Sequence, residues 1–156
     1  MPAVVAAAIA GLAWTMDDTS FAVTVLLGFA AFLRTGEMIS LIHQDIAVDL
    51  ESTRIILAFP ATKTSKQVSD SVELLDSCLC PLVHSVLKPG TTLPFCGLTA
   101  NQFRARLKVY LNFFALLSFN FTAYSLRRGG ASHCFATGTH FDDLLLRGRW
   151  QSENLP

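Results

Sequence analysis

The sequence has 156 residues, of which 51% are hydrophobic and 15% are charged, and its formal net charge is zero. Its two longest apolar runs, residues 3–14 and 21–33, are shorter than the ~20 residues that a membrane-spanning helix needs, and no Lys or Arg precedes them as in a secretory signal. We therefore expect one domain with an apolar core, and neither a membrane protein nor a secreted one.

The first half of the chain predicts helices followed by a small sheet. The apolar run predicts a helix over residues 3–15, and polar residues 17–20 offer N-cap chemistry for a second helix that runs through Leu33. A short helix is expected over residues 37–41. Three short segments, rich in Val and Ile and separated by polar turns, predict an antiparallel sheet: residues 45–50, 54–59 and 68–74.

Helices return in the second half. We expect one over residues 75–88, ended by a Pro-Gly pair, and a long one that is capped by Thr99 or Asn101 and ends near residue 117. Its last apolar residues are expected in the core: Phe113, Phe114, Leu116 and Leu117. Two more helices are expected over residues 125–137 and 141–146. The predicted fold class is α+β, mostly α, with one small three-stranded antiparallel sheet.

The four cysteines and four histidines show no metal-ligand spacing. Cys78 and Cys80 are one residue apart, which is not the CxxC spacing of zinc or redox sites. We expect no metal and no cofactor, and we expect reduced cysteines in a nuclear or cytoplasmic protein.

Charge is divided unevenly along the chain. Residues 1–100 contain five Lys or Arg and nine Asp or Glu, whereas residues 101–156 contain seven and three. A basic half on a neutral chain can form a phosphate-binding face. A solvated surface has the same composition, so charge alone leaves both interpretations open.

Two basic motifs lie in the first half. Arg34 follows the second apolar run, and Glu37 three residues later can pair with its guanidinium. Lys63 and Lys66 lie in a polar turn between the second and third predicted strands. Taken singly, these are also the patterns of a helix-end ion pair and a solubilising turn.

Two further motifs lie near the end of the chain. Tyr124 and Arg127 are three residues apart at the start of a predicted helix, and so share a face. Four small residues follow, at positions 129–132, and permit close approach of another segment. Trp150 follows two arginines in the segment RGRWQS. Ordinary helix packing and a core tryptophan would give the same patterns.

The order and spacing of these motifs resemble the catalytic domain of the tyrosine recombinases, the phage-integrase family. The resemblance extends from about Pro2 to the end of the chain and is most specific around Arg34 and Arg127. The segment YSLRRGG, residues 124–130, resembles eukaryotic, mobile-element-like members. The resemblance implies an integrase-type fold in which residues 1–156 form a partial catalytic domain without the family's core-binding domain.

The resemblance also implies roles for individual residues. Arg34 and Arg127 would bind the non-bridging oxygens of the scissile phosphate, which planar guanidinium groups recognise bidentately. Lys63, which fits better than the other lysine of its turn, would protonate the leaving 5′ oxygen. Glu37 would support the first arginine, and the ring N–H of Trp150 would bind the phosphate. The other basic residues of the second half would contact DNA: Arg104, Arg106, Lys108, Arg128, Arg147 and Arg149.

This sequence departs from the family's pattern at two points. Tyr124 stands where the family usually has a histidine, and a phenol with a pKa near ~10 is a poor base at neutral pH. The family's nucleophilic tyrosine has no counterpart in this sequence, since residues 151–156 lack tyrosine and Tyr110 precedes the second arginine. The resemblance therefore implies phosphate binding without a covalent phosphotyrosine intermediate.

Three functions remain open from the sequence. The first is a truncated recombinase domain with DNA as its partner, no small-molecule substrate, and a monomeric state in isolation, although full-length relatives oligomerise on DNA. The second is a decayed, non-catalytic helical module for binding or regulation. The third is an unrelated helical or membrane-associated protein. Convergence of the proposed phosphate-binding side chains in one cleft would favour the first.

Overall fold

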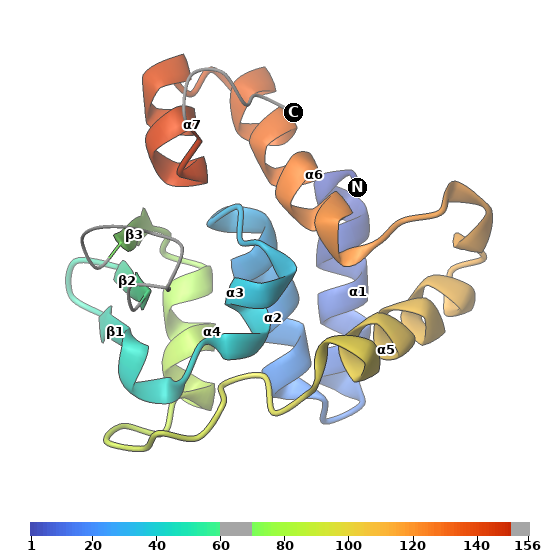
Figure 1. Ribbon diagram of the computed structural model, residues 1–156, viewed down its shortest axis with the longest axis horizontal. Helices are drawn as coiled ribbons and strands as arrows, with labels where there is room; N and C mark the ends of the chain where they lie inside the picture. The colour runs from blue at the N-terminus through green and yellow to red at the C-terminus, as the bar shows by residue number, and fades with distance from the viewer. Residues whose placement is uncertain (60–69, 151–156) are drawn as a thin grey trace.

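The computed structural model describes residues 1–59 and 70–150, and in it a mostly helical body lies beside a small sheet (Figure 1). The helices of the described residues are α1 (Ala3–Thr15), α2 (Thr19–Ala30), α3 (Thr35–Ser40), α4 (Leu79–Val86), α5 (Ala100–Phe113), α6 (Ala123–Ala136) and α7 (Phe141–Gly148), with 3-10 turns η1 (His43–Asp45) and η2 (Leu117–Phe119). None of these helices is long and apolar enough to cross a bilayer.

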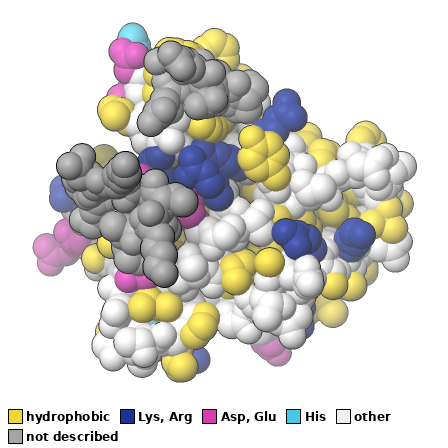
Figure 2. All heavy atoms as spheres, viewed as in Figure 1, with side chains coloured by type: hydrophobic (Ala, Val, Ile, Leu, Met, Phe, Trp, Pro, Cys, Tyr) yellow, Lys and Arg dark blue, Asp and Glu magenta, His cyan; other side chains and the backbone are white. Residues whose placement is uncertain are grey.

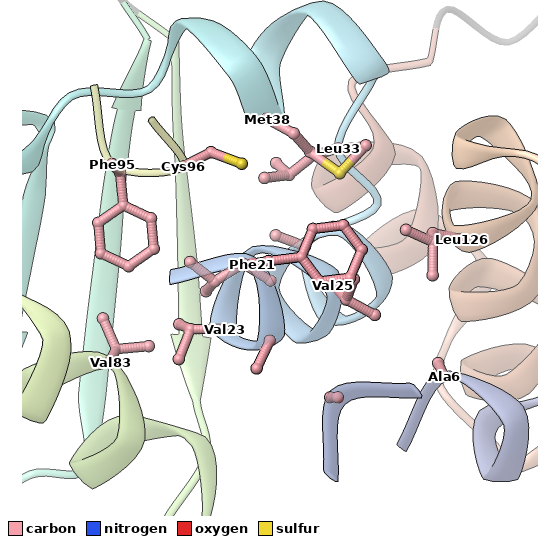
Figure 3. Close-up of a cluster of buried hydrophobic side chains, with 14 of the residues drawn as sticks. Ala6, Phe21, Val23, Val25, Leu33, Met38, Val83, Phe95, Cys96 and Leu126 are labelled. Atoms are coloured by element: carbon pink, nitrogen blue, oxygen red, sulfur yellow. The ribbon is translucent and has the colours of Figure 1, made fainter. Parts of the chain in front are cut away.

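Helix α2 is the central element of the core. It contacts α1, α4 and α6, and Phe21, Val23 and Val25 on it are fully buried. Figure 3 shows these side chains between Val83 of α4 and Leu126 of α6. This position explains why α2 is apolar around nearly its whole circumference, since every face of the helix meets another element.

The sheet is three-stranded and antiparallel, as expected. Its strands β1 (Ile46–Asp49), β2 (Arg54–Phe59) and β3 (Asp70–Leu75) are in the order β1-β2-β3. In β2 and β3 the buried side chains alternate with exposed ones, and the cross-strand pairs Ile55–Leu74 and Leu57–Val72 face the core. Residues 68 and 69 of the third predicted strand lie outside the described residues.

Two helices end earlier than the sequence predicts, each in a left-handed turn. Helix α2 ends at Ala30 and not at Leu33, because Phe32 has φ of 51° and the Leu33 N–H returns to the Gly28 carbonyl at 3.1 Å. This is a Schellman motif with phenylalanine where glycine is usual. Arg34 therefore does not end a helix, but occupies the N-cap position of α3.

Helix α5 ends at Phe113 in place of Leu117, and Ala115 has φ of 54°. The expectation that four apolar residues at this end belong to the core is half wrong. Phe114 and Leu116 pack against the core, whereas Phe113, the last residue of α5, is 69% exposed and Leu117, which follows the turn, is 46% exposed.

Helices α2 and α6 approach closely at Gly130. A Cβ at this position would lie 1.9 Å from the carbonyl oxygen of Phe29, so only glycine allows the crossing without displacement of the backbone. The crossing places the N-terminal half of α6 against the left-handed turn after α2. It therefore determines where the Arg127 side chain can reach.

We predict that Gly130→Ala lowers the free energy of unfolding by about 2 kcal/mol or more, because α6 must move away from α2. Gly11→Ala is a matched control in α1, where an added Cβ meets nothing within 4 Å. This control should raise the free energy of unfolding by about 0.5–1 kcal/mol through helix propensity. Urea denaturation of both variants measures the difference, and equal effects would contradict the close crossing.

Candidate phosphate-binding site

Arg127 of α6 is buried at the point where two other helices end. Its side chain is 2% exposed, one Nη–H donates to the carbonyl oxygen of Phe32, and the other donates to the carbonyl oxygen of Gly148 at 2.5 Å. Helix C-termini have unpaired carbonyls and the negative end of the helix dipole. The guanidinium satisfies one carbonyl at each of the two ends, and in this way joins α2 and α7 to α6.

The turn after α7 repeats the geometry of the turn after α2. Arg149 has φ of 52°, and the Trp150 N–H returns to the Leu145 carbonyl at 3.1 Å. The turn places the Trp150 ring 4.7 Å from the Arg127 Cζ and stacks it near Phe32 at 6.0 Å between ring centroids. A cation beside an indole face is stabilised by the ring quadrupole. Arg127 and Trp150 are thus brought together, as the family resemblance implies.

Glu37 pairs with two more arginines, Arg34 and Arg149. Its Oε1 accepts from Arg34 Nη1 at 2.8 Å, and its Oε2 accepts from the Arg34 backbone N–H and from Arg149 Nη2, both at 2.6 Å. The Arg34 side chain remains 53% exposed, whereas that of Arg149 is 7% exposed. We call Arg34, Glu37, Arg127 and Arg149 the arginine cluster.

Positive charge exceeds negative charge in the arginine cluster. Burial lowers the pKa of Arg127 to about 10, the charges of Arg34 and Arg149 act in the same direction, and Glu37 opposes them. A second carboxylate borders the cluster: Asp70 Oδ2 lies 3.5 Å from Arg149 Nε, and the Asp70 side chain is 56% exposed. Figure 2 shows basic side chains gathered at the centre of the visible face. This arrangement favours an anion, which would relieve the repulsion among the guanidinium groups.

The remaining predicted phosphate-binding residues lie at the border of the arginine cluster or outside the described residues. Tyr124 lies on the first turn of α6 and is 48% exposed. It is near enough to Arg127 to raise the pKa of that guanidinium slightly against the effect of burial. Lys63 and Lys66 lie outside the described residues. The residues flanking that segment do border the cluster, since Arg149 lies 4.7 Å from the Phe59 ring centroid and 3.5 Å from Asp70.

The six predicted DNA contacts fall into two groups. Those on α5 are exposed or pair with residues outside the arginine cluster: Lys108 is exposed, Arg104 bonds to Asn101 at 3.0 Å, and Arg106 pairs with Asp18 at 2.9 Å.

The other three DNA candidates lie in or next to the arginine cluster. Arg128 is exposed beside Arg127, and the Arg147 guanidinium lies 5.6 Å from the Phe32 ring centroid. Arg149 is turned inward to Glu37 and Asp70. The sequence did not predict this inward position, because no sequence pattern indicates that an arginine adopts the left-handed backbone conformation. Among residues 1–59 and 70–150 no three His, Cys, Asp or Glu side chains group as metal ligands.

Comparison with known proteins shows the fold and no closer relationship. No family model matches the chain, and no curated protein matches it. Among solved structures, the XerH site-specific recombinase in a pre-cleavage complex with its difH substrate superposes with a TM-score of 0.70 at 15% identity. The match covers 97% of this chain and 47% of the XerH chain, so this chain spans about half the length of that recombinase. The chain has the fold of a tyrosine recombinase catalytic domain.

We predict that Arg127→Lys lowers the free energy of unfolding by about 2 kcal/mol, since one ammonium group cannot reach both helix-end carbonyls and a buried carbonyl loses its donor. Arg128→Lys changes the adjacent, exposed arginine in the same way and should remain within about 0.5 kcal/mol of the wild type. Thermal or urea denaturation distinguishes the two. Similar effects would show that Arg127 does not hold the helix ends.

Proposed function

We propose that this chain is the phosphate-binding part of a DNA breaking-and-rejoining domain of the tyrosine recombinase type. The observation that supports this best is the arginine cluster itself, in which Arg34 and Arg149 share Glu37 while Arg127 is held by carbonyls at the ends of two helices. A partly buried excess of positive charge binds an anion more strongly than exposed lysines would. The fold shared with a recombinase supports a DNA phosphate as that anion.

In this proposal each group of the cluster has a separate task. Arg127 keeps N–H groups that its two carbonyls do not use, since a guanidinium has five donors; because the residue is 2% exposed, the phosphate reaches them only when the side chains that cover them move aside. Arg34 offers its exposed edge, while Glu37 holds its other side. Trp150 donates its indole N–H, Tyr124 donates its phenol O–H, and Lys63 protonates the leaving oxygen.

We also propose that neither tyrosine of the sequence attacks DNA. Tyr110 is buried and donates to Asp18 Oδ2 at 2.9 Å. Burial and this hydrogen bond raise the pKa of Tyr110 to about 12, which disfavours the phenolate that a nucleophile requires. Tyr124 lies one helical turn before Arg127, where a hydrogen bond to the phosphate is its expected contribution.

DNA affinity measured against salt tests the proposed function. Wild-type protein should bind a short duplex with an affinity that falls as salt rises, because bound phosphates release counterions. Arg34→Ala should weaken binding about tenfold, as expected for a charged hydrogen bond, and reduce the slope of log affinity against log salt by about 0.9.

The matched control for this measurement is Arg54→Ala. Arg54 pairs with Glu73 at 3.1 Å on the sheet, and both side chains are about half exposed. Its loss removes the same charge outside the arginine cluster and should leave DNA affinity unchanged. Absence of salt-dependent binding by the wild type would contradict the proposal and favour the non-catalytic helical module.

A suicide substrate tests the assignment of the tyrosines. A nicked duplex that traps covalent protein–DNA adducts should give none with this chain, because no activated phenol is placed at the phosphate. An adduct that disappears in Tyr124→Phe would make Tyr124 the nucleophile and overturn the assignment.

A further inference from the structure

Arg149 occupies an unusual position for an arginine. It has φ of 52°, in the left-handed region that favours glycine, yet its side chain is 7% exposed and directed into the protein. Its guanidinium meets Glu37 at 2.6 Å, Asp70 at 3.5 Å, and the face of Phe59 at 4.7 Å. Three elements, α3, β2 and β3, therefore meet the residue that follows α7.

The contact with Glu37 completes the support of Arg34. Without Arg149, Glu37 Oε2 would retain only the Arg34 backbone N–H, a contact between neighbours of the same short helix. With Arg149, the carboxylate is also held from across the fold, by a residue 112 positions away. A carboxylate fixed on both oxygens cannot rotate freely, so its contact with Arg34 Nη1 at 2.8 Å has a defined direction.

We propose that Arg149 is a positioning residue that fixes Glu37 and thereby directs the exposed edge of Arg34 toward the DNA phosphate. This inference rests on the proposed function. Arg149 does not itself bind the phosphate: its Nη2 is engaged by Glu37, and its Nε is enclosed, without a hydrogen-bond partner among the described residues and 3.5 Å from Asp70. Its effect on DNA passes through Arg34.

A double-mutant cycle in DNA affinity tests this positioning role. Arg149→Gly removes the side chain and leaves a residue suited to positive φ, so the turn after α7 is retained. It should weaken binding of a short duplex roughly fivefold to tenfold in the wild-type background, within the range for coupled residues of one network. In the Arg34→Ala background the same change should have little effect.

Two further variants make the result specific. Arg149→Lys, which retains one donor for Glu37, should recover part of the affinity lost in Arg149→Gly. Arg54→Gln, which breaks the exposed pair with Glu73, removes one charge elsewhere and should leave affinity unchanged. Equal losses from Arg149→Gly with and without Arg34 would overturn the positioning role and make Arg149 a direct or long-range contributor.

A second measurement separates this inference from the proposed function. In the free protein, the guanidinium ¹⁵N–¹H signals of Arg34 should report a restrained side chain, and Arg149→Gly should shift them toward those of a free arginine. Unchanged Arg34 signals would overturn the positioning role even if DNA binds. Wild-type protein that shows no salt-dependent DNA binding would instead overturn the proposed function, and with it the part of the inference that concerns DNA.

Discussion

The guanidinium of Arg127 is buried where α2 and α7 end, and the arrangement of the site depends on this contact. Moving a charged group out of water is costly unless hydrogen bonds replace the lost solvent. Here the replacement is a carbonyl at each helix end, and these carbonyls would otherwise lack donors. One side chain thus satisfies two helix termini, while two helix dipoles stabilise its charge.

Packing and chemistry therefore depend on the same few residues. Gly130 allows α6 to approach α2, which places Arg127 beside Phe32. The Phe32 ring belongs to a small apolar cluster with Ala131 and Leu144, against which Trp150 packs. The Trp150 ring in turn lies 4.7 Å from the Arg127 Cζ. A change in the helix crossing would alter both the stability of the α6–α7 pair and the position of Arg127.

Regular elements could be predicted from the sequence because their signals are local. The bounds of α1 and β2 agree with the expected residues 3–15 and 54–59, since apolar periodicity and polar turns define both. The pairing of Arg34 with Glu37 and the meeting of Arg127 with Trp150 were also predictable, the first from spacing and the second from family resemblance. The sheet followed from short Val- and Ile-rich segments.

The left-handed turns could not be predicted, because glycine usually marks them and this chain has phenylalanine and arginine there. Phe32 and Arg149 adopt positive φ at a cost of about 1–2 kcal/mol each for an ordinary residue. Tertiary contacts offset this cost: the Phe32 ring is fully buried, and the Arg149 guanidinium meets two carboxylates. The local sequence around a turn does not indicate contacts with distant residues, so the inward position of Arg149 could not be predicted.

The two arginines expected to bind phosphate are held by different means, and the difference has a consequence. Arg127 is fixed by backbone carbonyls, which are neutral and do not titrate, whereas Arg34 is fixed by a carboxylate that also reduces the net positive charge. If only carbonyls held the arginines, repulsion among the guanidinium groups would oppose folding. If each arginine had a carboxylate of its own, the cluster would have little attraction for an anion. Glu37, shared by Arg34 and Arg149, and Asp70 beside Arg149 give the three guanidinium groups two carboxylates, so positive charge remains in excess. The exposed edge of Arg34, fixed by Glu37, needs little reorganisation when an anion arrives, and preorganised donors of this kind favour a transition state of developing charge.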